Sequence, residues 1–131
     1  MTLQVPLVWS LHLSYLAMSL GFILLALAKM NLIPSVSIGF HTITVGGMGL
    51  MILSMISRAS LGHTGRLIKA NVWVTCSLLA LSFAAIDRVT GSLLGMEYSI
   101  VIASSALLWS IGFLIFVFAY VRILFSENMS R

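Results

Sequence analysis

The sequence predicts an all-α membrane protein, namely an antiparallel bundle of four transmembrane helices with both termini in the cytoplasm. Of the 131 residues, 60% are hydrophobic and only 8% are charged, whereas soluble domains carry about 25% charged residues. The hydrophobic residues form four long runs with short polar breaks between them, which is typical of helices that cross a bilayer. More Lys and Arg residues lie at one side of the predicted bundle than at the other, and this difference predicts how the protein is oriented in the membrane.

The first two hydrophobic runs are each long enough to cross a bilayer. The first predicted helix covers roughly residues 7–28, and Lys29 and Pro34 follow it. The second covers roughly residues 37–57, with Arg58 at its exit. Because a helix needs about 20 apolar residues to cross the hydrocarbon core, both runs predict complete spans.

The last two runs predict the remaining spans of a single module that covers residues 1–131. The third predicted helix covers roughly residues 70–86 and is closed by Asp87 and Arg88, while the fourth covers roughly residues 98–125. The third run is close to the lower limit of about 17 residues for a span. Strands are excluded because the runs do not alternate polar and apolar residues, and because backbone groups in lipid must be hydrogen-bonded within their own segment.

The distribution of the 7 Lys and Arg residues predicts the orientation. We name the side of the membrane that holds the N-terminus face A and the opposite side face B. The residues predicted at face A are Arg58, Arg66, Lys69, Arg122 and Arg131, and those predicted at face B are Lys29 and Arg88. Since Lys and Arg are enriched in cytoplasmic loops, face A is predicted to be cytoplasmic.

Composition and spacing exclude several classes of protein. The formal net charge of +4 does not come from a basic stripe, so nucleic-acid binding is not predicted. The first hydrophobic run begins near Pro6 and is too long for the h-region of a cleavable signal peptide. The single cysteine, Cys76, excludes an internal disulfide. Residues 7–28 contain no carboxylate, which a small four-helix drug exporter would need in its first helix.

Three histidines are the candidate metal ligands of the nitrogen type: His12, His41 and His63. Polar groups within membrane spans are candidates for function, although an imidazole can also hydrogen-bond between helices or lie in the headgroup zone. From the helical rise, His12 lies roughly 7 Å below face A and His41 about 6 Å below face B. One metal ion or haem iron cannot join these two across a core of ~30 Å. Because His63 follows the second helix back to face A, His12 and His63 form the predicted intrachain pair.

Softer metal ligands lie in the half of the bilayer next to face A. Cys76 lies about 9 Å below face A, and Met48, Met51 and Met55 form a stripe on the second helix. Thioether and thiolate groups suit copper(I), so copper is a second candidate metal. Methionine also fills gaps in apolar cores, and this structural role is the favoured interpretation of the stripe.

Glycines mark two further segments. The second predicted helix contains Gly39, Gly46, Gly47 and Gly49. Small residues let helices approach closely, and this role is favoured over the alternative that the glycines make room for a flat cofactor. Glycines also flank His63 within residues 60–66, so the backbone can turn sharply or approach a ligand there. Arg58 and Arg66 bracket that segment and can pair with carboxylates or phosphates, or they can anchor the topology at the headgroups. The 3 acidic residues are predicted at the membrane edges and form no catalytic set. The sequence therefore gives little support to the hypothesis that the protein is an enzyme.

Three segments of the sequence resemble the NnrS family. They are residues 55–66, residues 41–49, and the opening from Val8 to Tyr15 that leads to Gly21. The resemblance is close over residues 6–70 and is limited to hydropathy in the last two predicted helices. It corresponds to the C-terminal third of the family, whose members usually have many more helices than these four. The family's N-terminal Trp-His-x-His-Glu segment has no counterpart here.

The resemblance implies a polytopic inner-membrane protein linked to nitric oxide that holds haem and copper. It also implies that His12, His41 and His63 are the family's C-terminal histidines, without assigning a metal to any of them. A cofactor site shared with the N-terminal part would be incomplete in this chain. The chain is therefore expected to be a fragment or split gene product, or to assemble with an N-terminal partner or with itself.

Two hypotheses of function follow from the sequence. In the first, the chain binds haem, with copper as a second candidate, and helps the cell withstand nitric oxide, which is the expected ligand. His12 and His63 are the first choice of ligands and His41 the second, while Arg58 and Arg66 are candidate partners of the haem propionates. In the second, the chain is a cofactor-free structural or assembly subunit that docks through its glycine-rich second helix.

Overall fold

The computed structural model describes residues 5–63 and 71–125, with side chains described up to Val121. Within these residues all regular structure is helical, and 4 helices are long and apolar enough to cross a membrane. This finding confirms the predicted all-α membrane class. The spans are α1 (Pro6–Lys29), the second span (Val36–His63), α4 (Val72–Leu93) and α5 (Tyr98–Phe125).

The second span is one continuous helix with three parts. These are α2 (Val36–His41), η2 (Thr42–Gly49) and α3 (Leu50–His63). η2 is a π-helix of 8 residues, in which hydrogen bonds run from residue i to i+5. No feature of the hydrophobic pattern predicted it. π-helical turns are rare in proteins, and those that interrupt α-helices often lie at functional sites. His41, which directly precedes η2, is therefore a candidate functional residue.

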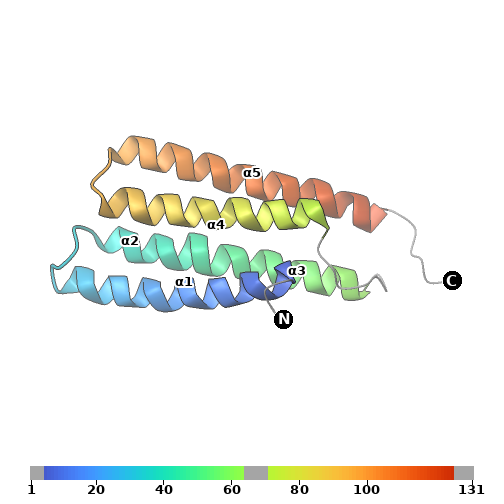
Figure 1. The fold of residues 1–131 in the computed structure, drawn as a ribbon, viewed down its shortest axis with the longest axis horizontal. Helices are drawn as coiled ribbons and strands as arrows, with labels where there is room; N and C mark the ends of the chain where they lie inside the picture. Colours follow the sequence, from blue (N-terminus) through green and yellow to red (C-terminus); the bar gives the residue numbers. More distant parts are fainter. Residues whose placement is uncertain (1–4, 64–70, 126–131) are drawn as a thin grey trace.

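Figure 1 shows the four spans lying side by side in the order α1, second span, α4 and α5. α5 packs along α4, and the second span packs against both α1 and α4. The connections between α1 and α2 and between α4 and α5 lie at one end of the bundle, while the start of α1, the end of α3 and the start of α4 lie toward the other (Figure 1). The main apolar core joins α3, α4 and α5 through Leu53, Leu78, Leu81 and Phe116.

Local sequence explains where several helices begin and end. At the start of α2, Ser35 Oγ accepts a hydrogen bond from the Ser37 amide at 3.1 Å. At the start of α4, Asn71 Oδ1 accepts one from the Val74 amide at 2.9 Å. Such caps satisfy amide groups that have no partner in the first helical turn. Shortly after α4, Gly95 adopts a φ of 68°, which glycine tolerates and which commonly ends a helix.

The prediction that Asp87 and Arg88 close the third helix is wrong. α4 continues past Ile86 to Leu93, so both charged residues lie inside the helix. They are accommodated because each finds a polar neighbour on another helix. Ser104 Oγ on α5 donates to Asp87 Oδ2 at 2.6 Å, and the Arg88 guanidinium lies between His41 and the ring of Tyr98.

The second helix was also predicted too short. It was expected to end at residue 57 with Arg58 at its exit, but α3 continues to His63. Leu61 is buried within this extension, one turn beyond the buried Ser57, so the helix still presents an inward face beyond the last hydrophobic run. Arg58 and His63 are consequently helical residues rather than parts of a loop.

The glycines of the second span serve contacts within the chain. A Cβ on Gly39 would lie 2.6 Å from Leu25 Cγ, and a Cβ on Gly47 would lie 2.5 Å from Met18 Cγ. α1 therefore approaches the second span closely only because these positions have no side chain. This agrees with the interpretation of the glycines as helix-contact residues, because Gly39 and Gly47 face α1 of the same chain.

Candidate functional site

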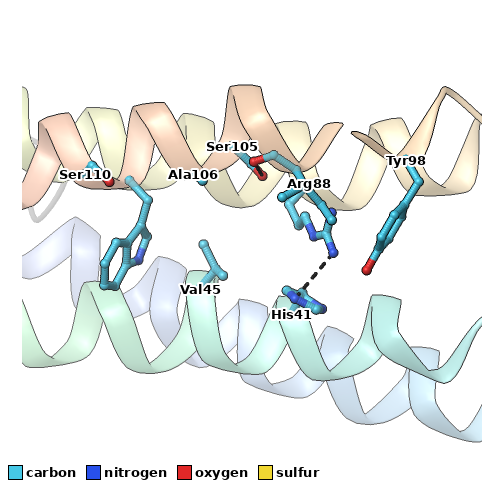
Figure 2. Close-up of a pocket in the computed structure, with 9 residues that line it drawn as sticks. His41, Val45, Arg88, Tyr98, Ser105, Ala106 and Ser110 are labelled. Carbon is cyan, nitrogen blue, oxygen red and sulfur yellow. Dashed lines mark hydrogen bonds between the residues drawn. The ribbon is translucent and has the colours of Figure 1, made fainter. Parts of the chain in front are cut away.

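A cavity of about 490 Å³ lies between the second span and α5, with Arg88 of α4 at its polar end. We call this cavity the groove. Its volume falls within the range of ligand sites, roughly 300–1,000 Å³. Figure 2 shows His41 and Arg88 pointing toward each other across it, with Tyr98 beside them and Val45 further along. The groove is lined by His41, Val45, Arg88, Tyr98, Ile102, Ser105, Ala106, Trp109 and Ser110.

The hydrogen bonds of His41 define its tautomer. Nδ1 lies 2.7 Å from the Ser37 carbonyl oxygen and 3.0 Å from Ser37 Oγ. A carbonyl oxygen can only accept, so the network assigns the proton to Nδ1 and the lone pair to Nε2. The half-buried imidazole therefore presents a hydrogen-bond acceptor, Nε2, to the groove.

Arg88 is the functional residue that sequence reasoning missed. Its side chain is only 4% exposed, although it was predicted to mark the membrane edge at face B. Nη2 lies 3.4 Å from His41 Nε2, and the guanidinium carbon lies 5.1 Å from the centre of the Tyr98 ring. Nη1 is buried and has no hydrogen-bond partner among the described residues.

Arg88 carries a permanent charge that the described carboxylates do not neutralise. Arginine stays protonated in proteins. Asp87 accepts its hydrogen bond from Ser104, and Glu97 accepts one from Ser99. The groove is therefore a cationic site in which Nη1, with its two N–H bonds, has no hydrogen-bond partner among the described residues. Its chemistry suits an anion.

The same charge lowers the suitability of His41 as a metal ligand. The nitrogen that would bind a metal, Nε2, already faces the Arg88 guanidinium at 3.4 Å. A metal cation at that nitrogen would lie next to a positive charge in a medium of low dielectric constant. The contact between Arg88 and His41 is long for a hydrogen bond and therefore weak. A metal would still bind His41 Nε2 only after the Arg88 side chain had moved away.

Among the residues that the structure describes, no arginine is hydrogen-bonded to the second ring nitrogen of His12. Its Nδ1 lies 2.8 Å from the Val8 carbonyl oxygen, so the proton is again assigned to Nδ1 and the lone pair to Nε2. The side chain is exposed on the outer face of α1, beside Tyr15 and Leu16, each of which is 63% exposed. A hydrogen bond that fixes the tautomer in this way is typical of metal-binding histidines.

His12 and His63 both lie toward the end of the bundle where α1 begins, at different heights along it. His12 lies six residues after Pro6, so roughly 9 Å into α1, while His63 is the last residue of α3, which projects beyond the start of α1 (Figure 1). The pairing of these two histidines within one chain stays a prediction. His63 and Arg58 are exposed, and Arg66 lies outside the described residues.

Metal ligands do not cluster in the part of the chain that the structure describes. There, no group of three or more His, Cys, Asp or Glu side chains comes together. Cys76 is a free, exposed thiol on α4, and Met55 is 60% exposed. A copper site built from these sulfur atoms stays a prediction.

One signal in the sequence could have revealed Arg88. Gly95 ends the stretch after Arg88, in which residues 89–94 are apolar or hydroxyl-bearing apart from Gly91. A glycine commonly lies just beyond a helix end. Placing the helix end there, rather than at the first charged residue, puts Arg88 inside the span. A charged side chain inside a span is a candidate for function by default.

The fold and these polar groups define a class: a multi-pass helical membrane protein with imidazole and guanidinium groups inside its spans. Residues 1–127 match the model of the NnrS protein family, and the chain belongs to this family. The match extends through α5, whereas sequence reasoning found close resemblance only as far as residue 70. No curated protein and no solved structure matches the chain. Membership of the family suggests a membrane protein of the nitric oxide response.

Proposed function

We propose that this chain is a haem-binding module of the inner (plasma) membrane that acts in the cell's response to nitric oxide, with copper as a second candidate metal. The four spans would alternate in direction, with both termini in the cytoplasm. The family match and the four apolar helices support the setting, and the excess of Lys and Arg at face A supports the orientation. Bound haem would supply a ferrous iron that binds nitric oxide.

The observation that carries the proposal is the geometry of His12. An imidazole on the exposed face of a membrane span is costly unless something covers it. With Nδ1 held by the Val8 carbonyl oxygen at 2.8 Å, Nε2 points away from the helix backbone and is free to bind iron. The neighbouring exposed side chains of Tyr15 and Leu16 provide an aromatic and an aliphatic surface for a flat apolar ligand.

The second ligand would come from outside α1. Candidates are a second copy of the chain, an N-terminal NnrS-like part, or His63, which lies toward the same end of the bundle (Figure 1). Arg58 is exposed near His63 and would pair with a propionate, as would Arg66. His41 is the second choice because Arg88 faces its Nε2 at 3.4 Å.

The test is the optical spectrum of the chain purified in detergent after expression with haem supplied. The reduced protein is expected to show a haem spectrum that changes when nitric oxide is added. His12→Ala should reduce the haem content strongly, whereas His41→Ala should leave most of it. A chain without haem or copper after both are supplied would contradict the proposal. If only His41→Ala lowered the haem content, the haem ligand would be His41 in the groove instead of His12.

A further inference from the structure

We propose that the groove between the second span and α5 binds an anionic phospholipid, whose phosphate pairs with Arg88 and whose acyl chain lies along α5. The proposal goes beyond haem binding and involves a different part of the chain. It starts from an uncompensated charge. Arg88 is 4% exposed, its Nη1 has no partner among the described residues, and no described carboxylate is hydrogen-bonded to it.

The position of Arg88 fits a lipid phosphate near face B. It lies five residues before Leu93, the last residue of α4, and therefore about 8 Å from that end of the helix. Long Arg side chains near the ends of spans reach toward headgroups. A phosphate offers two oxygens in the geometry that a guanidinium binds with two parallel hydrogen bonds.

A second cavity connects this position with the helix connections at face B. It measures about 180 Å³ and shares His41 and Tyr98 with the groove. Pro34 and Met96, which belong to the two connections, line it together with the hydroxyl-bearing residues Ser35, Ser37 and Ser92. Hydroxyl groups of this kind hydrogen-bond the polar part of a lipid.

Beyond Arg88 the groove is mostly apolar, with Ser105 and Ser110 as its hydroxyl-bearing residues. Val45, Ile102, Ala106 and Trp109 line it in the direction of the bilayer centre, and Figure 2 shows Val45 further along η2 than His41. Trp109 lies eleven residues after Tyr98, so roughly 16 Å along α5, which is about half of the hydrocarbon core. Polar, cationic and apolar surfaces therefore follow one another in the order of a phospholipid's headgroup, phosphate and acyl chain.

The charge balance favours a lipid with a net negative charge. Arg88 brings one positive charge that is hydrogen-bonded to no carboxylate of the described residues, and a lipid such as phosphatidylglycerol neutralises this charge. A zwitterionic lipid such as phosphatidylcholine carries a phosphate but also adds a positive charge of its own. Inorganic phosphate would satisfy the guanidinium and leave the apolar part of the groove unfilled.

The experiment uses Trp109 as a reporter of the acyl chain. The full chain carries Trp9→Phe and Trp73→Phe, so that Trp109 remains as the only tryptophan of the 3. The delipidated protein in detergent is titrated with phosphatidylglycerol or phosphatidylcholine that carry the same brominated acyl chains, which quench tryptophan fluorescence. Phosphatidylglycerol is expected to bind at least about tenfold more tightly, because its net negative charge neutralises Arg88, whereas the choline group of phosphatidylcholine brings a second positive charge close to the guanidinium.

Matched variants test the role of Arg88. Arg88→Met should abolish the preference for phosphatidylglycerol, and Arg88→Lys should keep part of it. Lys29→Met, which removes one exposed positive charge at the same end of the bundle, should leave it unchanged. Inorganic phosphate should not displace the lipid.

Several outcomes would overturn the proposal: equal quenching by the two lipids, a preference that survives Arg88→Met, or displacement by inorganic phosphate. If Arg88→Met does not fold, the affinities of the two lipids are compared in the protein with an unmodified groove and in Arg88→Lys. That comparison still decides whether Arg88 selects the anionic lipid. A loss of haem in His12→Ala has no bearing on these results, so failure of the proposed function and failure of this inference can be distinguished.

Discussion

Arg88 Nη2 lies 3.4 Å from His41 Nε2, although 47 residues separate the two in the sequence. The neighbouring carboxylate of Asp87 faces another helix and accepts a hydrogen bond from Ser104 at 2.6 Å. Two adjacent residues of opposite charge thus make their hydrogen bonds to different helices. Arg88 joins α4 to the second span through His41 and to α5 through the ring of Tyr98, and Asp87 joins α4 to α5 through Ser104. No described carboxylate is hydrogen-bonded to Arg88.

The first prediction concerns the cost of that buried charge. Replacing Arg88 by methionine, which has a similar length and no charge, should stabilise the delipidated protein by about 1 kcal/mol or more, because burying an ion without a full set of partners is unfavourable. The measurement is the thermal unfolding midpoint in detergent. Lys29→Met is the control, since Lys29 is exposed and should change the midpoint little. A large loss of stability in Arg88→Met would mean that its contacts with His41 and Tyr98 outweigh the cost of its charge.

The second prediction tests the close approach of α1 and the second span. Gly39→Ala should destabilise the protein by roughly 1–3 kcal/mol, as overpacking usually does, because the new Cβ would lie 2.6 Å from Leu25 Cγ and 2.9 Å from the Leu25 backbone nitrogen. Unfolding in a denaturing detergent measures the difference.

Gly62→Ala is the matched control for this substitution. Gly62 is also helical, but a Cβ there would meet no atom within 4 Å. Alanine should therefore be neutral or stabilise the helix by about 0.5–1 kcal/mol. Equal effects of the two substitutions would contradict the close contact between α1 and the second span.

The sequence predicted the four spans because their length and apolar character are dictated by the bilayer rather than by tertiary contacts. It could not place the ends of α3 and α4 correctly, because a charged residue was interpreted as the membrane boundary. Arg88 lies within α4 since His41 and Tyr98 receive it, and these neighbours become close only in the folded bundle. The π-helix that follows His41 has no signature in the hydrophobic pattern.

The third prediction concerns the hydrogen bond that joins α4 to α5. Ser77 is fully buried, and its Oγ donates to the Gly112 carbonyl oxygen at 2.8 Å. Ser77→Ala should destabilise the protein by about 0.5–1.5 kcal/mol, the usual net value of such a bond.

Ser82 provides the comparison for Ser77. Its Oγ donates to Leu78, within the same helix, at 2.8 Å. Because the Ser82 bond lies within α4 and the Ser77 bond joins α4 to α5, Ser82→Ala should change the free energy of unfolding by less than Ser77→Ala. The reverse order would show that the contact between α4 and α5 does not depend on Ser77.

The fourth prediction addresses the orientation in the membrane. In a Cys76→Ser background, Met96→Cys should react in intact cells with a thiol reagent that cannot cross the inner membrane, whereas Gly62→Cys should react only after the cells are broken. Met96 and Gly62 are both exposed and belong to opposite ends of the bundle (Figure 1). The reason is the excess of Lys and Arg at face A. The burial of Arg88 in the groove increases this difference between the two faces. Lys29 then remains as the exposed positive charge described at face B. The opposite labelling pattern would place both termini outside the cytoplasm. Labelling of both cysteines from one side would mean that α4, the helix between them, does not cross the membrane.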